Sequence, residues 1–149
     1  MRKAFSIVEL MIVVAVIGIL AALSIPYLHN HATQAKEAAA KDNLRILREA
    51  ISFYAVQHGD TAPGYPGNDR SDTPTEDSFR LQLIVEQNYL RKTPSNPFNG
   101  LDTIRIIGNA EAFPAEGTGN YGWLYQPATG NIRVDWPGQD GDGVPYLDY

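Results

Sequence analysis

The sequence predicts an α+β protein in which a long N-terminal helix, hydrophobic in its first half and amphipathic in its second, packs against a small antiparallel β-sheet. Three observations predict this fold. Residues 10–27 form a run without any charged side chain. Residues 29–58 place apolar side chains every three to four positions, which is the period of an α-helix. The last third contains short β-branched or aromatic runs separated by Gly, Pro and Asn, as in a small sheet.

Composition limits the chain to one modest domain and one long element. Apolar residues make up 44% of its 149 residues, yet the mean hydropathy of −0.25 is typical of a water-soluble protein, so the apolar residues must be unevenly distributed. The absence of cysteine excludes a disulfide framework, a thiolate zinc site and a cysteine nucleophile. The formal charge of −5 disfavours nonspecific binding to nucleic acid.

The uncharged run from Leu10 to Tyr27 is long enough to cross a bilayer. As a helix it spans about 27 Å, because each residue contributes 1.5 Å. Arg2 and Lys3 precede it, and the positive-inside rule keeps such residues cytoplasmic and sends the rest of the chain across the membrane. The sequence therefore predicts a single membrane pass.

A secretory signal peptide is the alternative interpretation, with Ala21 and Ala22 as cleavage candidates. Three features argue against it. Glu9 lies inside the apolar stretch, the stretch is longer than the apolar region of an ordinary signal peptide, and it continues into further helix without a loop. Pro26 and Gly18 predict a gentle kink and not a break, so the two halves are expected to form one helix of about 50 residues.

The second half of this helix is predicted to face the core along one stripe. The stripe consists of Ala32, Ala35, Ala39, Ile46 or Leu47, Ala50 or Ile51, and Tyr54. After Gly59 the composition changes to Gly, Pro, Asp, Asn and Thr, which indicates the start of a loop-rich head.

The sequence from Lys3 to Ala22, KAFSIVELMIVVAVIGILAA, resembles the class III signal of type IV prepilins and type II secretion pseudopilins. The resemblance implies cleavage between Ala4 and Phe5 by a prepilin peptidase, followed by methylation of the new Phe5 amine. The family more often has glycine before the cut, where this chain has Ala4. The expected organisation is a leader peptide (residues 1–4), the transmembrane and filament-core half of the helix (residues 5–28) and a pilin-like head that includes the amphipathic half (residues 29–149).

Glu9 is the ionisable residue in this apolar stretch. A carboxylate at the centre of a bilayer costs about 2.5–3.5 kcal/mol on insertion scales, so such a residue is a functional candidate by default. After cleavage Glu9 would lie in the first helical turn, close to the positive Phe5 amine, where the helix dipole favours a negative charge. The resemblance implies that Glu9 pairs with the Phe5 amine of a neighbouring subunit and selects the axial register. The alternative is that Glu9 reaches the lipid headgroups.

A short helix and three strands are predicted in the head. The sequence Thr73-Pro74-Thr75-Glu76 predicts the helix start, with Thr73 as its cap and Glu76 closing a capping box. The helix is expected to end at Arg91, Lys92 and Pro94. The predicted strands are residues 103–107, 121–125 and 131–135, with a hairpin loop over residues 126–130.

Residues 88–100 resemble the segment after the second helix of the major pseudopilins, where the family tends to have Asp, Trp and Gly in a proline-centred turn. This chain has Asn96, Phe98 and Asn99 in that turn. This resemblance and the missing disulfide pair favour a pseudopilin over a pilus subunit.

A candidate calcium site lies near the C-terminus, where Asp135, Asp140 and Asp142 occur in a glycine-rich stretch. Calcium takes six to eight oxygen ligands, which carboxylates and backbone carbonyls supply. The stretch resembles the acidic, glycine-rich loop that binds calcium in the major pseudopilins. Its spacing differs from that of an EF-hand, and Asp-Gly pairs are also ordinary turn residues, so a plain turn is the alternative. No other cofactor is predicted.

The sequence shows no catalytic constellation. Residues 117–122 have the spacing of a GxGxxG dinucleotide-binding loop, but a strand-like run follows where that loop needs a helix, so they are predicted to form a turn. No serine has a recognisable His and Asp partner arrangement. The chain is therefore predicted not to be an enzyme.

The predicted function is a structural subunit that polymerises through its N-terminal helix, in a type II secretion pseudopilus or a type IV pilus-like filament. The alternative is a single-pass anchored binding module that does not polymerise. The expected partners are other copies of the chain, a prepilin peptidase, an inner-membrane assembly platform and minor pilins or pseudopilins. The precursor is expected in the inner membrane with its head in the periplasm, and the assembled subunit in a periplasmic pseudopilus or a cell-surface pilus.

Overall fold

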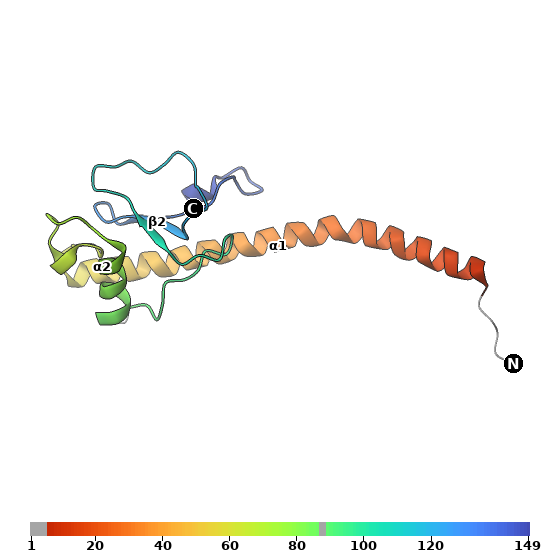
Figure 1. Cartoon of the computed structure of the whole chain (residues 1–149), viewed down its shortest axis with the longest axis horizontal. Helices are drawn as coiled ribbons and strands as arrows, with labels where there is room; N and C mark the ends of the chain where they lie inside the picture. The colour runs from red at the N-terminus through yellow and green to blue at the C-terminus, as the bar shows by residue number, and fades with distance from the viewer. Residues whose placement is uncertain (1–5, 87–88) are drawn as a thin grey trace. The chain divides into compact units, whose positions relative to one another are not determined.

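The computed structural model describes residues 6–86 and 89–149, without the side chains of residues 21–30. Its first element is the 51-residue helix α1, Ile7–Gln57, which continues through Pro26 without a break, as predicted (Figure 1). The chain divides into two compact units, residues 1–36 and residues 37–149. We call the second unit the head and describe each unit separately.

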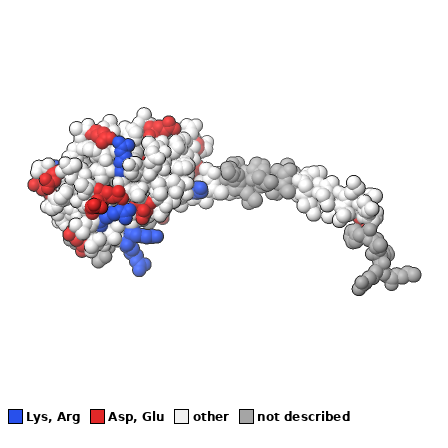
Figure 2. Space-filling model, viewed as in Figure 1, with Lys and Arg blue, Asp and Glu red and all other residues white. Residues whose placement is uncertain are grey.

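The described side chains of the first unit up to Leu20 are all exposed. Apolar residues dominate this stretch, from Ile7 at 78% exposure to Leu20 at 59%, and Figure 2 shows it as almost free of charged residues, which are scattered over the surface of the head. Among the described residues, no helix is both long and apolar enough to cross a membrane. The predicted membrane segment, residues 10–27, includes residues 21–27, which lie outside the described side chains.

The head contains a three-stranded sheet of β1 (Ile104–Ile106), β2 (Trp123–Gln126) and β3 (Asn131–Val134), in that spatial order. The predicted hairpin is confirmed, because β2 and β3 are antiparallel. The prediction of a wholly antiparallel sheet is wrong for β1, which runs parallel to β2. Parallel neighbours need a crossover of about a dozen residues or more, and residues 107–122 provide one. The fold class is therefore α+β with a mixed sheet.

The main core of the head lies between α1, the second helical segment and one face of the sheet. Trp123 and Tyr125 alternate along β2 and point into this core, where the buried residues of α1 meet them. The α1 residues in the core are Ala40, Leu44, Leu47, Ala50, Ile51 and Tyr54. Figure 1 shows α2 and β2 beside this part of α1.

The predicted stripe on α1 is correct at its C-terminal end and wrong at its start. Ala32, Ala35 and Ala39 are exposed, and Ala40 and Leu44 take the core-facing positions. Alanines occupy several faces of this segment, so their spacing alone does not identify the buried face. Burial of the Leu44 side chain contributes about 1.5–3 kcal/mol to stability, far more than burial of an alanine methyl. The face of α1 that carries Leu44 is therefore the one that packs against the core.

The opposite face of the sheet has a smaller core of its own. Leu124 points to this side and packs with Ile107 and Leu147, and Phe113 covers them. The guanidinium of Arg133 lies 4.5 Å from the centre of the Phe113 ring. Because both faces of the sheet are covered, all four residues of β2 are buried.

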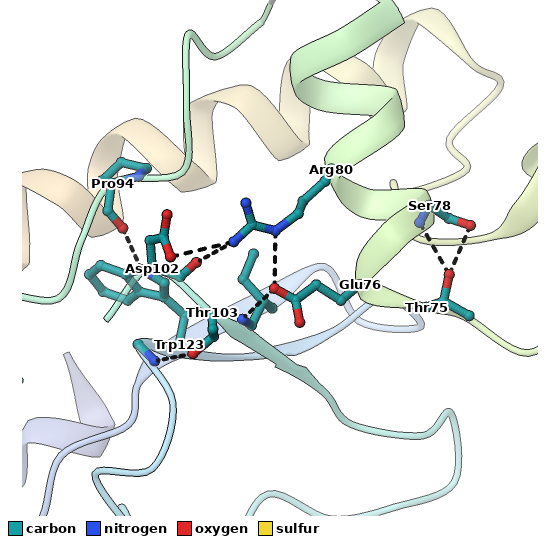
Figure 3. Close-up of polar contacts among 10 residues, drawn as sticks. Thr75, Glu76, Ser78, Arg80, Pro94, Asp102, Thr103 and Trp123 are labelled. Atoms are coloured by element: carbon teal, nitrogen blue, oxygen red, sulfur yellow. Dashed lines mark hydrogen bonds and ion pairs between the residues drawn. The ribbon is translucent and has the colours of Figure 1, made fainter. Parts of the chain in front are cut away.

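The second helical segment starts two residues later than predicted. It comprises α2 (Glu76–Arg80) and a π-helical turn, η2 (Leu81–Glu86). Its cap is Thr75, whose hydroxyl oxygen accepts the N–H of Ser78 at 3.1 Å (Figure 3). Thr73 is not the cap, because the backbone N–H of Thr75 is bonded to Gly64 O and so fixes Thr75 at the helix entrance.

Glu76 links α2 to the sheet and does not close a capping box. One carboxylate oxygen accepts the backbone N–H of Ile104 and the Nε–H of Arg80, each at 3.1 Å (Figure 3). Arg80 in turn donates to the carbonyl of Asp102 at 3.1 Å. The same figure shows the indole N–H of Trp123 donating to the carbonyl of Pro94, which fixes the segment leading to β1.

Candidate functional site

Glu9 lies in the first turn of α1 and forms a capping box with Ser6. The backbone N–H of Ser6 donates to the Glu9 carboxylate at 3.0 Å, and the Ser6 hydroxyl oxygen accepts the N–H of Val8 at 3.2 Å. This reciprocal arrangement satisfies N–H groups that a helix start leaves without partners. Glu9 therefore has a local structural role as well as the proposed role in assembly.

Sequence reasoning missed this capping box, although the Ser-x-x-Glu spacing before an apolar run is its usual signature. The predicted cleavage residues Ala4 and Phe5 lie outside the described residues. The pairing of Glu9 with a Phe5 amine thus stays a prediction.

Asp135 follows β3 directly and has a fully buried side chain. Its carboxylate accepts the N–H of Thr118 at 2.5 Å, the hydroxyl of Thr118 at 2.8 Å and the N–H of Tyr121 at 2.9 Å. Hydrogen bonds to an ionised acceptor are about twice as strong as neutral ones. Asp135 thereby fixes the predicted turn of residues 117–122 to the end of β3.

Asp140 is held by donors on both of its oxygens. Oδ1 accepts the N–H of Asp142 at 3.0 Å and that of Val144 at 2.9 Å. Oδ2 accepts the hydroxyl of Tyr149 at 2.8 Å and lies 3.7 Å from the Lys41 ammonium. The bond from Val144 and then that from Tyr149 lower the pKa of Asp140 below its ordinary value, and burial followed by the bond to Asp140 raises the pKa of Tyr149.

The structure does not bring the three predicted calcium ligands together. Asp142 is exposed, and the carboxylates of Asp135 and Asp140 each face their own set of N–H and O–H groups. Within the described residues no group of three or more His, Cys, Asp or Glu side chains is placed to hold a metal ion. Calcium takes six to eight oxygen ligands, and the carboxylate oxygens of Asp135 and Asp140 already accept protein donors, so the described donor set fits calcium poorly. Calcium binding stays a prediction from the sequence.

Asn96 organises the proline-centred turn at residues 96–101. Its fully buried side chain donates to the carbonyl of Gly122 at 3.0 Å and accepts the N–H of Phe98 at 2.9 Å. The Phe98 ring then stacks on Trp136 at 5.7 Å between ring centres and contacts Tyr146 at 4.6 Å. The turn thus joins the crossover before β2 to the C-terminal stretch.

We expect Asn96→Ala to destabilise the head by about 1–3 kcal/mol. It leaves the Phe98 N–H without its partner and removes one of the two donors of the buried Gly122 carbonyl, which keeps the Asp135 N–H at 3.3 Å. The measurement is chemical denaturation of the full chain, followed by the fluorescence of its two tryptophans. Asn43→Ala is the matched control, since the Asn43 amide makes one hydrogen bond to Ser95 O at the surface and its loss should cost about 1 kcal/mol or less. Equal losses for the two variants would contradict the organising role of Asn96.

The N-terminal segment and most of the chain are similar to known proteins. Residues 1–25 match the family described as the prokaryotic N-terminal methylation motif. The chain is also similar to prepilin peptidase-dependent protein D of Escherichia coli K12, with 30% identity over 112 residues, which are 72% of this chain and 73% of the relative.

Two further relatives carry different names. Type II secretion system core protein G of Pseudomonas aeruginosa is 27% identical over 117 residues, 78% of this chain and 76% of the relative. Type IV major pilin protein PilA of Myxococcus xanthus is 48% identical over 55 residues, 36% of this chain and 25% of the relative. No solved structure matches the chain.

Proposed function

The chain belongs to the type IV pilin and type II secretion pseudopilin family, and we propose that it polymerises through the N-terminal half of α1 into a filament. The observation that carries this proposal is the exposed apolar surface of residues 7–20, in which Glu9 is the single charge. The family is structural, so the chain is not an enzyme.

The apolar surface of residues 7–20 needs a partner on physical grounds. Each square ångström of apolar surface removed from water contributes about 25 cal/mol, and side chains such as Met11 at 68% exposure and Ile19 at 63% remain uncovered in the single subunit. A bilayer covers this surface before assembly, and the helices of other copies cover it in the filament. The precursor accordingly resides in the inner membrane with its head in the periplasm.

Processing supplies the partner of Glu9. Cleavage between Ala4 and Phe5 by a prepilin peptidase removes Arg2 and Lys3 and exposes a positive amine, which is then methylated. In an apolar filament core an unpaired charge is costly. A subunit that enters at the correct axial position neutralises both charges, since its Phe5 amine meets the Glu9 carboxylate of a neighbour.

The filament is a type II secretion pseudopilus or a type IV pilus-like fibre, and relatives of both kinds support the proposal. In either setting the subunit works with an inner-membrane assembly platform and with minor pilins or pseudopilins. Deletion of its gene from the source organism distinguishes a secretion pseudopilus from a pilus-like fibre. Lost protein secretion without loss of surface fibres indicates the pseudopilus, and lost fibres with intact secretion indicate the pilus.

Processing is the first test of the proposal. When the chain is co-expressed with a prepilin peptidase, we expect its intact mass to equal that of the precursor without residues Met1–Ala4 and with one added methyl group. Co-expression with a catalytically inactive peptidase is the control and should leave the precursor mass unchanged. A leader that stays attached in the presence of active peptidase would favour the anchored binding module.

A further inference from the structure

We propose that the C-terminal stretch of the head, residues 138–149, is closed onto α1 by the chain's own hydrogen-bond donors and by Lys41, without a divalent cation. We call the residues that make this closure the C-terminal clasp. They are Glu37, Lys41, Asp140, Tyr146 and Tyr149.

The first support is the set of contacts that Asp140 makes. An ionised carboxylate offers about four lone-pair positions, and three of those of Asp140 accept hydrogen bonds from Asp142, Val144 and Tyr149. The Lys41 ammonium lies beside Oδ2 at 3.7 Å as an ion pair. Its side chain is only 5% exposed. A calcium ion at Asp140 would have to compete with the Lys41 ammonium beside Oδ2, or displace one of these protein donors.

The second support is the backbone of the loop, which closes on itself. The N–H of Asp140 donates to the carbonyl of Val144 at 2.9 Å, and the N–H of Tyr146 donates to that of Gly138 at 3.1 Å. Backbone carbonyls are among the ligands that a calcium loop supplies. In this loop the carbonyls of Gly138 and Val144 each use one lone pair for a backbone N–H.

The third support is the attachment of the stretch to α1. The Tyr146 hydroxyl donates to the Glu37 carboxylate at 3.0 Å, and the Lys41 ammonium lies 4.1 Å from the centre of the Tyr149 ring. Glu37 and Lys41 are four residues apart and therefore share one helical face. The ammonium thus supplies, beside Asp140, the positive charge that a calcium ion would otherwise bring.

Aromatic contacts complete the closure. The rings of Tyr146 and Tyr149 meet edge to face at 5.5 Å between centres, and Tyr146 also contacts Phe98 in the proline-centred turn. Such pairs contribute beyond their buried area. The clasp therefore connects the C-terminal stretch to α1 and, through the contact of Tyr146 with Phe98, to the proline-centred turn, in a chain that has no cysteine for a disulfide.

The test is thermal unfolding of the full chain in detergent, with calcium or with the chelator EGTA, for the wild type, Tyr149→Phe and Asp140→Asn. We expect the wild-type Tm to be the same in both conditions. Tyr149→Phe, which keeps the ring and removes the donor, should lower Tm by about 2–8 °C equally in both. Tyr121→Phe is the control, since in the described structure Tyr121 contacts Asp135 through its backbone.

Hydrogen exchange of residues 138–146 gives an independent readout. Slow exchange in EGTA that becomes fast in Tyr149→Phe supports the clasp even where the change in Tm is small. A calcium-dependent rise of the wild-type Tm that disappears in Asp140→Asn would overturn the proposal and establish the calcium site predicted from the sequence. An unchanged Tm together with unchanged exchange in Tyr149→Phe would also overturn it.

Discussion

Subunits carrying Glu9→Ala will be processed normally but will fail to enter filaments. In the proposed filament core the Phe5 amine of the next subunit would then be buried without a counter-charge, at a cost of about 3–5 kcal/mol. Since about 1.4 kcal/mol corresponds to a factor of ten, we expect a loss of about a hundredfold or more in assembled subunit. The measurement is the amount of subunit in sheared, sedimented fibres, confirmed by electron microscopy.

The capping box makes Glu9→Ala ambiguous by itself, because Ala also removes the bond to the Ser6 N–H. Glu9→Gln resolves the ambiguity, since glutamine closes a capping box as glutamate does but carries no charge. Ser6→Ala is the complementary variant, which removes the hydroxyl that accepts the Val8 N–H and keeps the charge of Glu9. We expect Glu9→Gln to fail in assembly and Ser6→Ala to assemble, with the processed mass of each variant as control. The reverse result would assign Glu9 to helix capping and contradict the intersubunit pair.

Gly117→Ala will destabilise the head by about 3 kcal/mol or more. A Cβ at this position would lie 2.4 Å from the carbonyl oxygen and 2.5 Å from the nitrogen of Trp136, and backbone atoms cannot move aside as a flexible side chain can. The turn of residues 117–122 would have to leave Trp136, and the donors of Thr118 and Tyr121 would leave the buried Asp135 carboxylate. Overpacking of this kind costs about 1–3 kcal/mol, and the lost charged hydrogen bonds add to it.

Denaturation of the full chain with urea measures this loss. Gly141→Ala is the matched control, because a Cβ there meets no described atom within 4 Å, and we expect a change of about 0.5 kcal/mol or less. Gly122→Ala should resemble Gly117→Ala, since its Cβ would lie 2.3 Å from the Leu101 carbonyl oxygen. Similar stabilities for Gly117→Ala and Gly141→Ala would show that the turn moves freely and that the Asp135 contacts contribute little.

The sequence alone determined the features that depend on neighbouring residues. The uncharged run and the periodic stretch after it predicted α1, because hydrophobic period is a local property. A charge within an apolar stretch is also local, and it made Glu9 a functional candidate, whose role in assembly stays a prediction. The runs around Trp123 and Asn131 predicted β2 and β3 to within two residues, since an aromatic run, a glycine-containing loop and a β-branched run form a hairpin by local turn chemistry.

Only the tertiary structure decided which distant groups meet. The parallel direction of β1 depends on the path of residues 107–122, and the cap at Thr75 depends on a hydrogen bond to Gly64. The contacts of the aspartates near the C-terminus could likewise not be predicted from the sequence. The spacing of these aspartates predicts a cation site, which stays a prediction. In the folded head the hydroxyls of Thr118 and Tyr149 donate to the oxygens of Asp135 and Asp140, and the Lys41 ammonium lies beside Asp140. A carboxylate accepts a metal ion or N–H and O–H groups with the same lone pairs, so its role follows from the groups that folding places against it.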